Sequence, residues 1–306
     1  MKIVIAMDSF KGSLKTVEAC RIIADALSDA LPDAQIVTKP MADGGEGTAQ
    51  AMLEAAGGTW IPQTVMGPLP EMQVEAGFVW FDHDRSALVE MASASGLQLL
   101  TEDQMNPMLT TTYGTGQLIK AAAEQGAERI MLAVGGSATV DGGVGAAMAL
   151  GWRFLDGCGC DINLGGGGLG GIMTICDPVD LKLPPVQVLC DVDNPLCGQD
   201  GAASVYGPQK GATPEMVEQL EAGLANLAEL VRMNLGCEIE TVPGSGAAGG
   251  LSAGAIAFMS AELVSGVETV MACCNFKAEL ESADWIITGE GSFDQQSLSP
   301  TFTVEG

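Results

Sequence analysis

Histidine is almost absent from this sequence, whose 306 residues contain only His83. His83 lies between Asp82 and Asp84, in a polar stretch that predicts an exposed turn between strands. A Ser-His-Asp or Cys-His catalytic site would have to use this one residue, and a metal site built from several histidines is excluded. We therefore expect Asp or Glu to carry any proton transfer, with Lys as a less favoured base.

Positive charge is also scarce, with 13 Lys and Arg against 39 Asp and Glu and a net charge of −26. Affinity for nucleic acid comes mainly from clustered cations that face phosphates, so we expect no nucleic-acid partner. The same net charge repels free anionic substrates. If the substrate is a nucleotide, backbone N–H groups, a few placed lysines and Mg²⁺ must offset that repulsion locally.

Long apolar runs and paired cysteine motifs are missing as well. No apolar run approaches the roughly 20 residues that span a bilayer. The N-terminal run over residues 2–6 is followed too soon by Asp8 to predict an export signal. The nine cysteines include no Cys-x-x-Cys pair. We expect reduced thiols in a cytoplasmic protein that has no membrane partner.

Strand and helix patterns alternate along most of the chain, which predicts an α/β fold with parallel strands. Predicted strands cover residues 2–6, 35–39, 129–134, 186–190 and 285–288, and predicted helices cover residues 14–31, 49–56, 116–124, 143–150 and 214–233. The region from about residue 59 to 100 instead favours short strands, at 60–65, 73–81 and 87–91.

The 41 glycines gather in clusters, several of them where a predicted strand ends or a helix begins. At such places the backbone can approach an anion, and free helix N–H groups can bind phosphate oxygens. No cluster has the P-loop pattern or a clean dinucleotide fingerprint. The clusters lie at residues 44–47, 135–139, 142–143, 165–168, 244–250 and 289–291.

Carboxylates follow the same strand ends and glycine turns: Asp8, Asp43, Glu46, Asp141, Asp191, Asp193 and Glu290. Ligands of open α/β sheets bind at the carboxyl ends of the strands, so we expect these side chains to converge on one cleft. Phosphoryl transfer needs Mg²⁺ on oxygen ligands, a cation on the phosphates and a carboxylate near the attacking hydroxyl. The alternative for each Asp is that it caps a helix or closes a turn.

Two lysines lie in loops that also contain glycine. Lys11 stands in residues 9–13, which begin with Ser9, and Lys210 stands in residues 207–211. Because cations are few, both are candidates for contact with phosphate. The alternative is an ordinary solvated lysine at the surface.

These loops resemble those of the bacterial glycerate kinases that make 2-phosphoglycerate. The resemblance covers residues 1 to about 298 in order, and the motifs that carry it lie at residues 1–14, 40–48, 90–97, 111–116, 135–143, 190–196, 207–212 and 287–291. It implies an enzyme that uses ATP and Mg²⁺ to phosphorylate D-glycerate at its 2-hydroxyl or its 3-hydroxyl. It also implies a Rossmann- or flavodoxin-like domain over residues 1–65 plus 280–306, and an inserted α/β domain over residues 66–279.

The sequence departs from the family at three places. Met7 stands where the family usually has proline, and Val140 stands where an asparagine usually precedes the aspartate. After Leu298 the sequence leaves the family pattern and stops at Gly306. We therefore expect a C-terminally truncated chain whose outer domain is incomplete and exposes apolar strand edges.

On this hypothesis Asp191 or Asp8 orients the glycerate hydroxyl or accepts its proton, and Lys11 assists. Asp191 and Asp193 are the predicted Mg²⁺ ligands. The residues predicted to bind nucleotide or acceptor are Ser9, Asp43, Glu46, Gly135, Gly136, Ser137, Thr139, Asp141, Lys210 and Glu290. Two alternatives stay open: a truncated, inactive relative, and a carboxylate-based hydrolase of a small phosphorylated acid or sugar. A homodimer also stays open.

Overall fold

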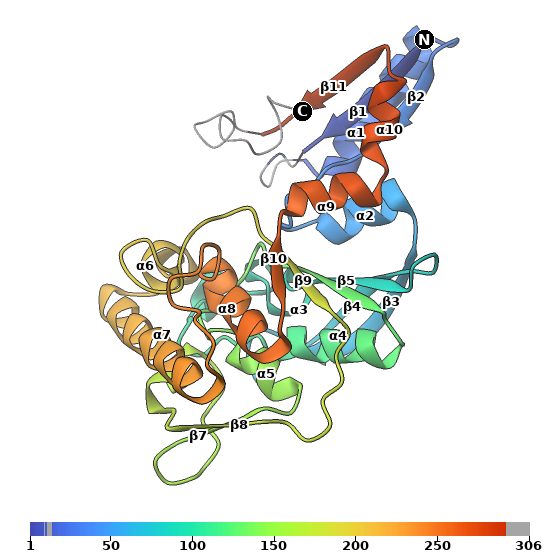
Figure 1. Cartoon of the computed structure of the whole chain (residues 1–306). Helices are drawn as coiled ribbons and strands as arrows, with labels where there is room; N and C mark the ends of the chain where they lie inside the picture. Colours follow the sequence, from blue (N-terminus) through green and yellow to red (C-terminus); the bar gives the residue numbers. More distant parts are fainter. Residues whose placement is uncertain (9, 11–13, 292–306) are drawn as a thin grey trace.

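The computed structural model describes residues 1–8, 10 and 14–291; Ser9, residues 11–13 and residues 292–306 lie outside it. Two main sheets organise the described part of the chain. The smaller sheet has three parallel strands in the order β11-β1-β2, drawn from both ends of the sequence: β1 (Lys2–Met7), β2 (Gln35–Thr38) and β11 (Trp285–Gly289). Figure 1 shows this sheet, with α1 (Thr16–Ala30), above the rest of the molecule.

The larger sheet has six strands in the order β10-β9-β6-β5-β4-β3. Four of them run parallel: β5 (Ser86–Glu90), β6 (Arg129–Ala133), β9 (Val186–Leu189) and β10 (Glu262–Val264). Two antiparallel strands complete it: β3 (Thr59–Met66) and β4 (Gln73–Phe81). The α/β prediction is confirmed. The larger sheet is mixed because short connections join β3 to β4 and β4 to β5, which makes these neighbours antiparallel.

Side chains on the central strands alternate between two apolar layers. Ile130 and Leu132 of β6 point into the core beneath α4 (Tyr113–Glu124), α5 (Val144–Ala149) and α8 (Ala247–Met259). Met131 and Ala133 of the same strand point into the opposite core. This period of two is what a strand covered on both faces requires.

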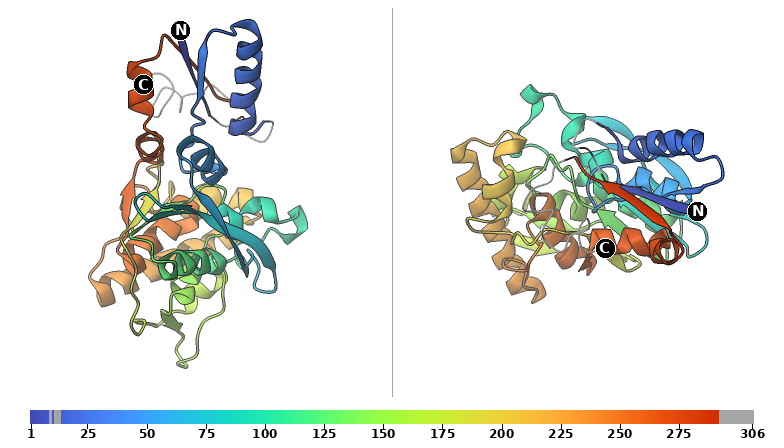
Figure 2. Two further views of the ribbon diagram at one scale, coloured as in Figure 1. Left: turned by 90° about the vertical axis from the view of Figure 1, so that its right-hand side faces the viewer. Right: turned by 90° about the horizontal axis from the view of Figure 1, so that it is seen from above.

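The opposite core joins the two sheets through α2 (Thr48–Ala56) and α9 (Gly266–Cys273). Val4 and Ala6 of the smaller sheet belong to the same buried cluster as Met131 and Leu189 of the larger one. Met52 of α2 lies in this cluster with no exposed surface. Figures 1 and 2 show α2 and α9 between the sheets, so this layer positions one sheet against the other.

The longest helix, α7 (Pro214–Leu235), matches its predicted range closely. The Thr213 hydroxyl accepts a hydrogen bond from the Met216 N–H, Pro214 occupies the first turn, and Gly236 ends the helix in the left-handed conformation. The remaining elements are α3 (Ala92–Ser95), α6 (Ala202–Tyr206), α10 (Phe276–Glu281), the hairpin β7 (Arg153–Leu155) and β8 (Thr174–Cys176), and the 3₁₀ turns η1 (Leu97–Leu99), η2 (Glu102–Gln104), η3 (Gly166–Gly171) and η4 (Pro208–Lys210).

Residues 244–250, predicted as a glycine loop, overlap the start of α8. Ala248, Gly249 and Gly250 have positive φ angles, and the helix then continues to Met259. Almost every side chain of this helix is buried, so it lacks the polar face that gives an amphipathic helix its period. That lack of a period explains why the sequence pattern indicated a loop and missed the helix.

Sheet membership differs from the predicted domain limits at one strand. The predicted outer domain includes residues 59–65, whereas β3 pairs with β4 in the larger sheet. The two-domain division itself stays a prediction.

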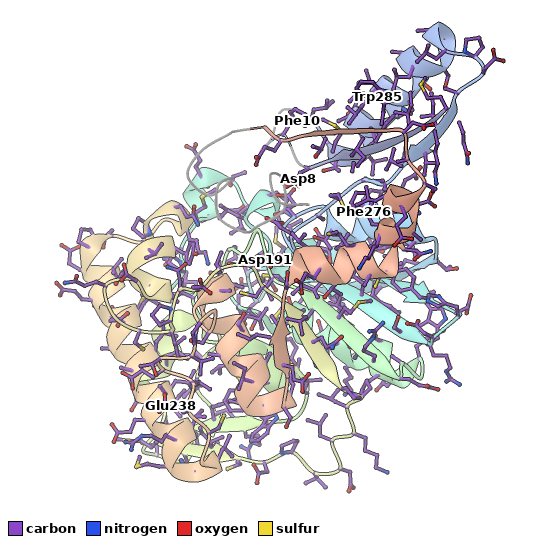
Figure 3. All side chains as sticks on the ribbon, turned by 45° about the horizontal axis from the view of Figure 1, so that its top comes forward. Asp8, Phe10, Asp191, Glu238, Phe276 and Trp285 are labelled. Carbon is purple, nitrogen blue, oxygen red and sulfur yellow. The ribbon has the colours of Figure 1, made fainter. Side chains whose placement is uncertain are left out.

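Trp285 and Ile286 on β11 expose 65% and 47% of their surface, and Trp285 is labelled in Figure 3. Among the described residues, no helix combines the length and apolar character needed to cross a bilayer.

Replacing Met52 by alanine tests the layer between the sheets. The side chain is fully buried, so we expect the free energy of unfolding to fall by about 2–5 kcal/mol. Met233→Ala, at a position 62% exposed on α7, serves as the control and should change it by less than about 0.5 kcal/mol. Urea denaturation followed by circular dichroism measures both, and equal losses would contradict the role of this layer.

Candidate active site

The carboxyl ends of four parallel strands meet at one edge of the larger sheet. Glu90 ends β5, Gly135 follows β6, Asp191 follows β9 and Ser265 follows β10. The segment after β2 reaches the same edge, since the Gly135 N–H donates to the Gly44 carbonyl at 3.0 Å. Segments distant in sequence therefore converge at this edge of the larger sheet.

Asp191 is held by the first residues of α9. Its carboxylate accepts hydrogen bonds from the Gly266 N–H at 3.2 Å and from the Val267 N–H at 3.0 Å. Desolvation raises the Asp191 pKa, and the negative charge of Asp43 adds to the rise, while the Ser265 hydroxyl and the Val267 N–H oppose it. The helix start thus fixes a half-buried carboxylate whose proton affinity is above the ordinary value.

Asp43 lies beside Asp191 and is exposed. Its carboxylate closes a turn by accepting the Gly45 N–H at 2.8 Å. A Cβ on Gly266 would lie 2.3 Å from the Asp43 carbonyl oxygen and 2.9 Å from the Asp191 Oδ2. Glycine at position 266 therefore lets the two acidic segments approach each other.

Glu90 is a buried acidic residue at this edge that sequence analysis did not select. Its side chain retains 7% exposure and accepts the Gly47 N–H at 2.9 Å and the Ala49 N–H at 2.8 Å, at the start of α2. Desolvation raises its pKa, and these two hydrogen bonds oppose the rise. The available signal was an acid at the end of an otherwise apolar strand, within one of the motifs that carry the resemblance.

The glycine loop over residues 135–139 packs tightly against the loop that contains Asp43. A Cβ on Gly135 would lie 2.3 Å from the Gly45 Cα, and one on Gly136 would lie 3.4 Å from the Glu46 Cβ. Gly136 is exposed, with a φ of 72°, and Glu46 is exposed beside it. The glycines therefore permit two loops to touch where a side chain would separate them.

Lys210 supports this glycine loop from beneath. Its Nζ donates to the Ser137 Oγ at 2.6 Å and to the Thr139 carbonyl at 2.8 Å, and the residue retains only 2% exposure. Desolvation lowers the Lys210 pKa to about 7, and the Asp141 charge opposes this shift. Direct contact between Lys210 and phosphate stays a prediction, since the structure places the ammonium under the loop.

Asp141 is 1% exposed and its carboxylate binds several internal donors. It accepts hydrogen bonds from the Thr112 N–H at 2.7 Å, the Thr112 hydroxyl at 2.9 Å, the Gly143 N–H at 3.1 Å and the Gly145 N–H at 3.3 Å. Desolvation is the main cause of its raised pKa. These contacts tie together the starts of α4 and α5, as a capping role would, and a role in ligand binding stays a prediction.

The other predicted residues lie near the smaller sheet or outside the described part. Asp8 follows β1, is half-buried, and donates its backbone N–H to the Gly289 carbonyl at 2.9 Å. Figure 3 shows Asp8 and Asp191 in the region between the two sheets. Glu290 follows β11, Asp193 is exposed two residues after Asp191, and Ser9 and Lys11 lie outside the described residues.

The sequence of the chain matches the glycerate kinase family over residues 3–305. The chain belongs to the glycerate kinase family. It is 47% identical over 299 residues to a glycerate kinase of Halalkalibacterium halodurans, which covers 97% of this chain and 78% of that protein. It is 44% identical over 302 residues to the glycerate 2-kinase of Escherichia coli, with 97% and 79% covered.

A solved structure agrees with the sequence comparison. The crystal structure assigned to glycerate kinase 2 from Salmonella typhimurium LT2 superimposes with a TM-score of 0.88 and 44% sequence identity, covering 98% of this chain and 81% of that one. The resemblance stated from the sequence motifs is confirmed. A kinase family implies ATP as a substrate.

Glu90→Ala tests the anchoring of α2 at this edge of the site. The change leaves the N–H groups of Gly47 and Ala49 without their acceptor, so we expect the free energy of unfolding to fall by about 2–4 kcal/mol. Glu124→Ala, at an exposed position of α4, is the control and should leave stability nearly unchanged. Chemical denaturation measures both, and a Glu90 variant as stable as its control would show that the anchoring is unimportant.

Gly135→Ala tests the contact between the two loops. The added Cβ meets backbone atoms of Gly45, which cannot rotate away, so we expect turnover to fall at least about tenfold through displacement of the loops. Gly170→Ala adds a Cβ with nothing within 4 Å and serves as the matched control. Steady-state kinetics of both variants measure the effect, and equal turnover would rule out a need for this close contact.

Proposed function

We propose that this protein transfers the γ-phosphoryl group of ATP to D-glycerate. The observation that carries the proposal is the convergence of Asp43, Asp191 and the glycine loop 135–139 at one sheet edge in a chain of the glycerate kinase family. The name of the Escherichia coli relative, a glycerate 2-kinase, supports 2-phosphoglycerate as the product over 3-phosphoglycerate.

Asp191 is the strongest candidate for the group that contacts the glycerate hydroxyl. General base catalysis favours a carboxylate whose pKa is raised toward neutral pH, and burial with the nearby Asp43 charge shifts Asp191 in that direction. The N–H groups at the start of α9 hold the carboxylate in one orientation. Asp8, at the end of β1, is the alternative base.

The residues at this edge fit a magnesium ion. Mg²⁺ prefers carboxylate oxygens and commonly keeps several waters, using one or two protein carboxylates together with substrate phosphates. Asp193 would hold it, together with Asp191 where Asp8 serves as the base, and Asp43 adds a further carboxylate beside Asp191. Within residues 1–8, 10 and 14–291 no group of three or more His, Cys, Asp or Glu side chains is gathered at one point, as a site made wholly of protein ligands would need. When bound, Mg²⁺ neutralises charge on the transferred phosphoryl group.

The remaining candidates are assigned to the phosphates and the acceptor. The backbone of the glycine loop and Lys11 would offset phosphate charge, while Glu46, Ser9 and Glu290 would contact the acceptor or the nucleotide. The separate sheet of β1, β2 and β11 supports this arrangement. We further propose that this smaller sheet and the larger one supply opposite walls of the site.

Asp191→Asn tests the proposed function at its central residue. An amide has nearly the same shape and can still accept a helix N–H, but it cannot accept the hydroxyl proton or attract Mg²⁺ by charge. We expect kcat for ATP-dependent phosphorylation of D-glycerate to fall about 100-fold or more. A coupled assay for ADP release, with Mg²⁺ present, measures the change.

The matched control is Asp33→Asn, which removes an exposed carboxylate in the turn before β2, at the amino end of that strand. It should keep the kcat of the unaltered protein. Wild-type turnover in the Asp191 variant would refute the assigned role. Phosphate release from a sugar phosphate without ATP consumption would refute the kinase assignment.

A further inference from the structure

The Ser137 hydroxyl has one hydrogen-bonding function that the described structure leaves unused. A hydroxyl carries one donor and two acceptor sites. The Ser137 Oγ accepts a hydrogen bond from the Lys210 Nζ at 2.6 Å, and its own O–H has no acceptor among the described residues. Ser137 retains 8% exposure and follows the exposed Gly136, so its hydroxyl lies just below the surface of the glycine loop.

We propose that Lys210 acts through Ser137: the buried ammonium fixes and polarises the hydroxyl, which then donates a hydrogen bond to an anionic oxygen bound at the glycine loop. Lys210 is thereby a positioning residue, and Ser137 is the group that touches the ligand. The inference rests on the proposed function and deepens it, because it names how the loop binds negative charge.

The placement of Lys210 favours this indirect action. The residue is 2% exposed, and its two hydrogen bonds go to Ser137 and to the Thr139 carbonyl. A buried ammonium is screened less by solvent than a surface lysine, so its charge acts more strongly on the adjacent hydroxyl. In a chain with a net charge of −26, such a buried cation beneath a glycine loop attracts an anion that the surface as a whole repels.

The ligand chemistry is an anionic oxygen, and the reaction offers two sources for it. One is a phosphoryl oxygen of ATP, and the other is the carboxylate of glycerate. Both accept a hydrogen bond from a hydroxyl, and both gain from the charge behind it. Measuring the binding of each ligand separately distinguishes the two sources.

The proposal predicts a dependence on pH. Burial lowers the Lys210 pKa to about 7 from its ordinary value of 10.5, so the ammonium is charged below that pH and loses its proton above it. Among the described residues, Asp141 and Tyr206 face it: the Asp141 charge favours the ammonium, and the Tyr206 ring lies 6.0 Å from the Nζ, with a pKa that burial raises. An anion favours the charged form, so affinity should fall as the pH rises past about 7.

The experiment compares Lys210→Met, Ser137→Ala and the double variant with the unaltered chain. Isothermal titration calorimetry measures the Kd of a non-hydrolysable ATP analogue with Mg²⁺, and of D-glycerate, at about pH 6.5 and about pH 9. For one ligand we expect each single variant to bind about tenfold more weakly at the lower pH, with a smaller difference at the higher pH. The double variant should bind no more weakly than either single variant.

Lys39→Met is the matched control. Lys39 also donates to two backbone carbonyls, those of Ala55 at 3.2 Å and Cys274 at 2.9 Å, but it lies at the far ends of α2 and α9. The Lys39→Met substitution removes the same charge as Lys210→Met, and it should preserve the Kd values of the ATP analogue and of D-glycerate and their pH dependence. Thermal melts establish that each variant is folded, and Ser137→Ala alone keeps the test valid if the Lys210 variant does not fold.

Each outcome decides the inference. Unchanged Kd values in the Ser137 variant overturn it, even when catalysis by the unaltered protein confirms the kinase. Equal weakening by Lys210→Met with and without the Ser137 hydroxyl also overturns it, because the lysine would then act by another route. If the unaltered protein binds neither ligand and shows no turnover, the proposed function fails and this inference fails with it.

Discussion

The candidate site depends on carboxylates that are held by backbone N–H groups at the starts of helices. Asp191 binds the start of α9, Glu90 binds the start of α2, and Asp141 ties together the starts of α4 and α5. A helix start has unpaired N–H groups and partial positive charge, so it stabilises a buried negative charge without a cation. This solution suits a protein with three times as many acidic residues as basic ones.

Close contact between backbones is the second constraint on the site. The loops that contain Asp43 and Gly135 touch through glycines, and Gly266 lets the Asp43 segment reach Asp191. The apolar layer of α2 and α9 fixes the larger sheet against the smaller one, so the carboxyl ends of both sheets are held in place. Packing and backbone conformation thus position the acidic groups on which phosphoryl transfer would depend.

The sequence predicted much of the fold because its periodic segments have one physical solution. The apolar run before Asp8 and the amphipathic pattern after Pro214 lie within β1 and α7. Helix α8 was missed because it is buried almost all round and has no polar face. The exact strand order was also beyond the sequence, since β11 pairs with β1 from the other end of the chain and β6 lies between β5 and β9.

The site residues that the sequence could predict were those marked by local sequence pattern, and those it missed depend on contacts between distant segments. The sequence indicated Asp191 and the glycine loop because they follow strands, and Asp43 because it lies in another glycine cluster, and the fold brings these segments together. It did not indicate that Glu90 anchors α2, since its N–H partners lie more than forty positions away. Nor did it distinguish Asp141, buried among internal donors, from the exposed Asp43.

The sequence by itself determined the family, the alternation of strands and helices, and the near-absence of histidine that leaves carboxylates as proton carriers. These features follow from residue type and local spacing. Only the tertiary structure decided which carboxylates are desolvated and that Lys210 lies beneath the glycine loop. Desolvation depends on every segment packed around a charge, and most of those segments are distant in sequence.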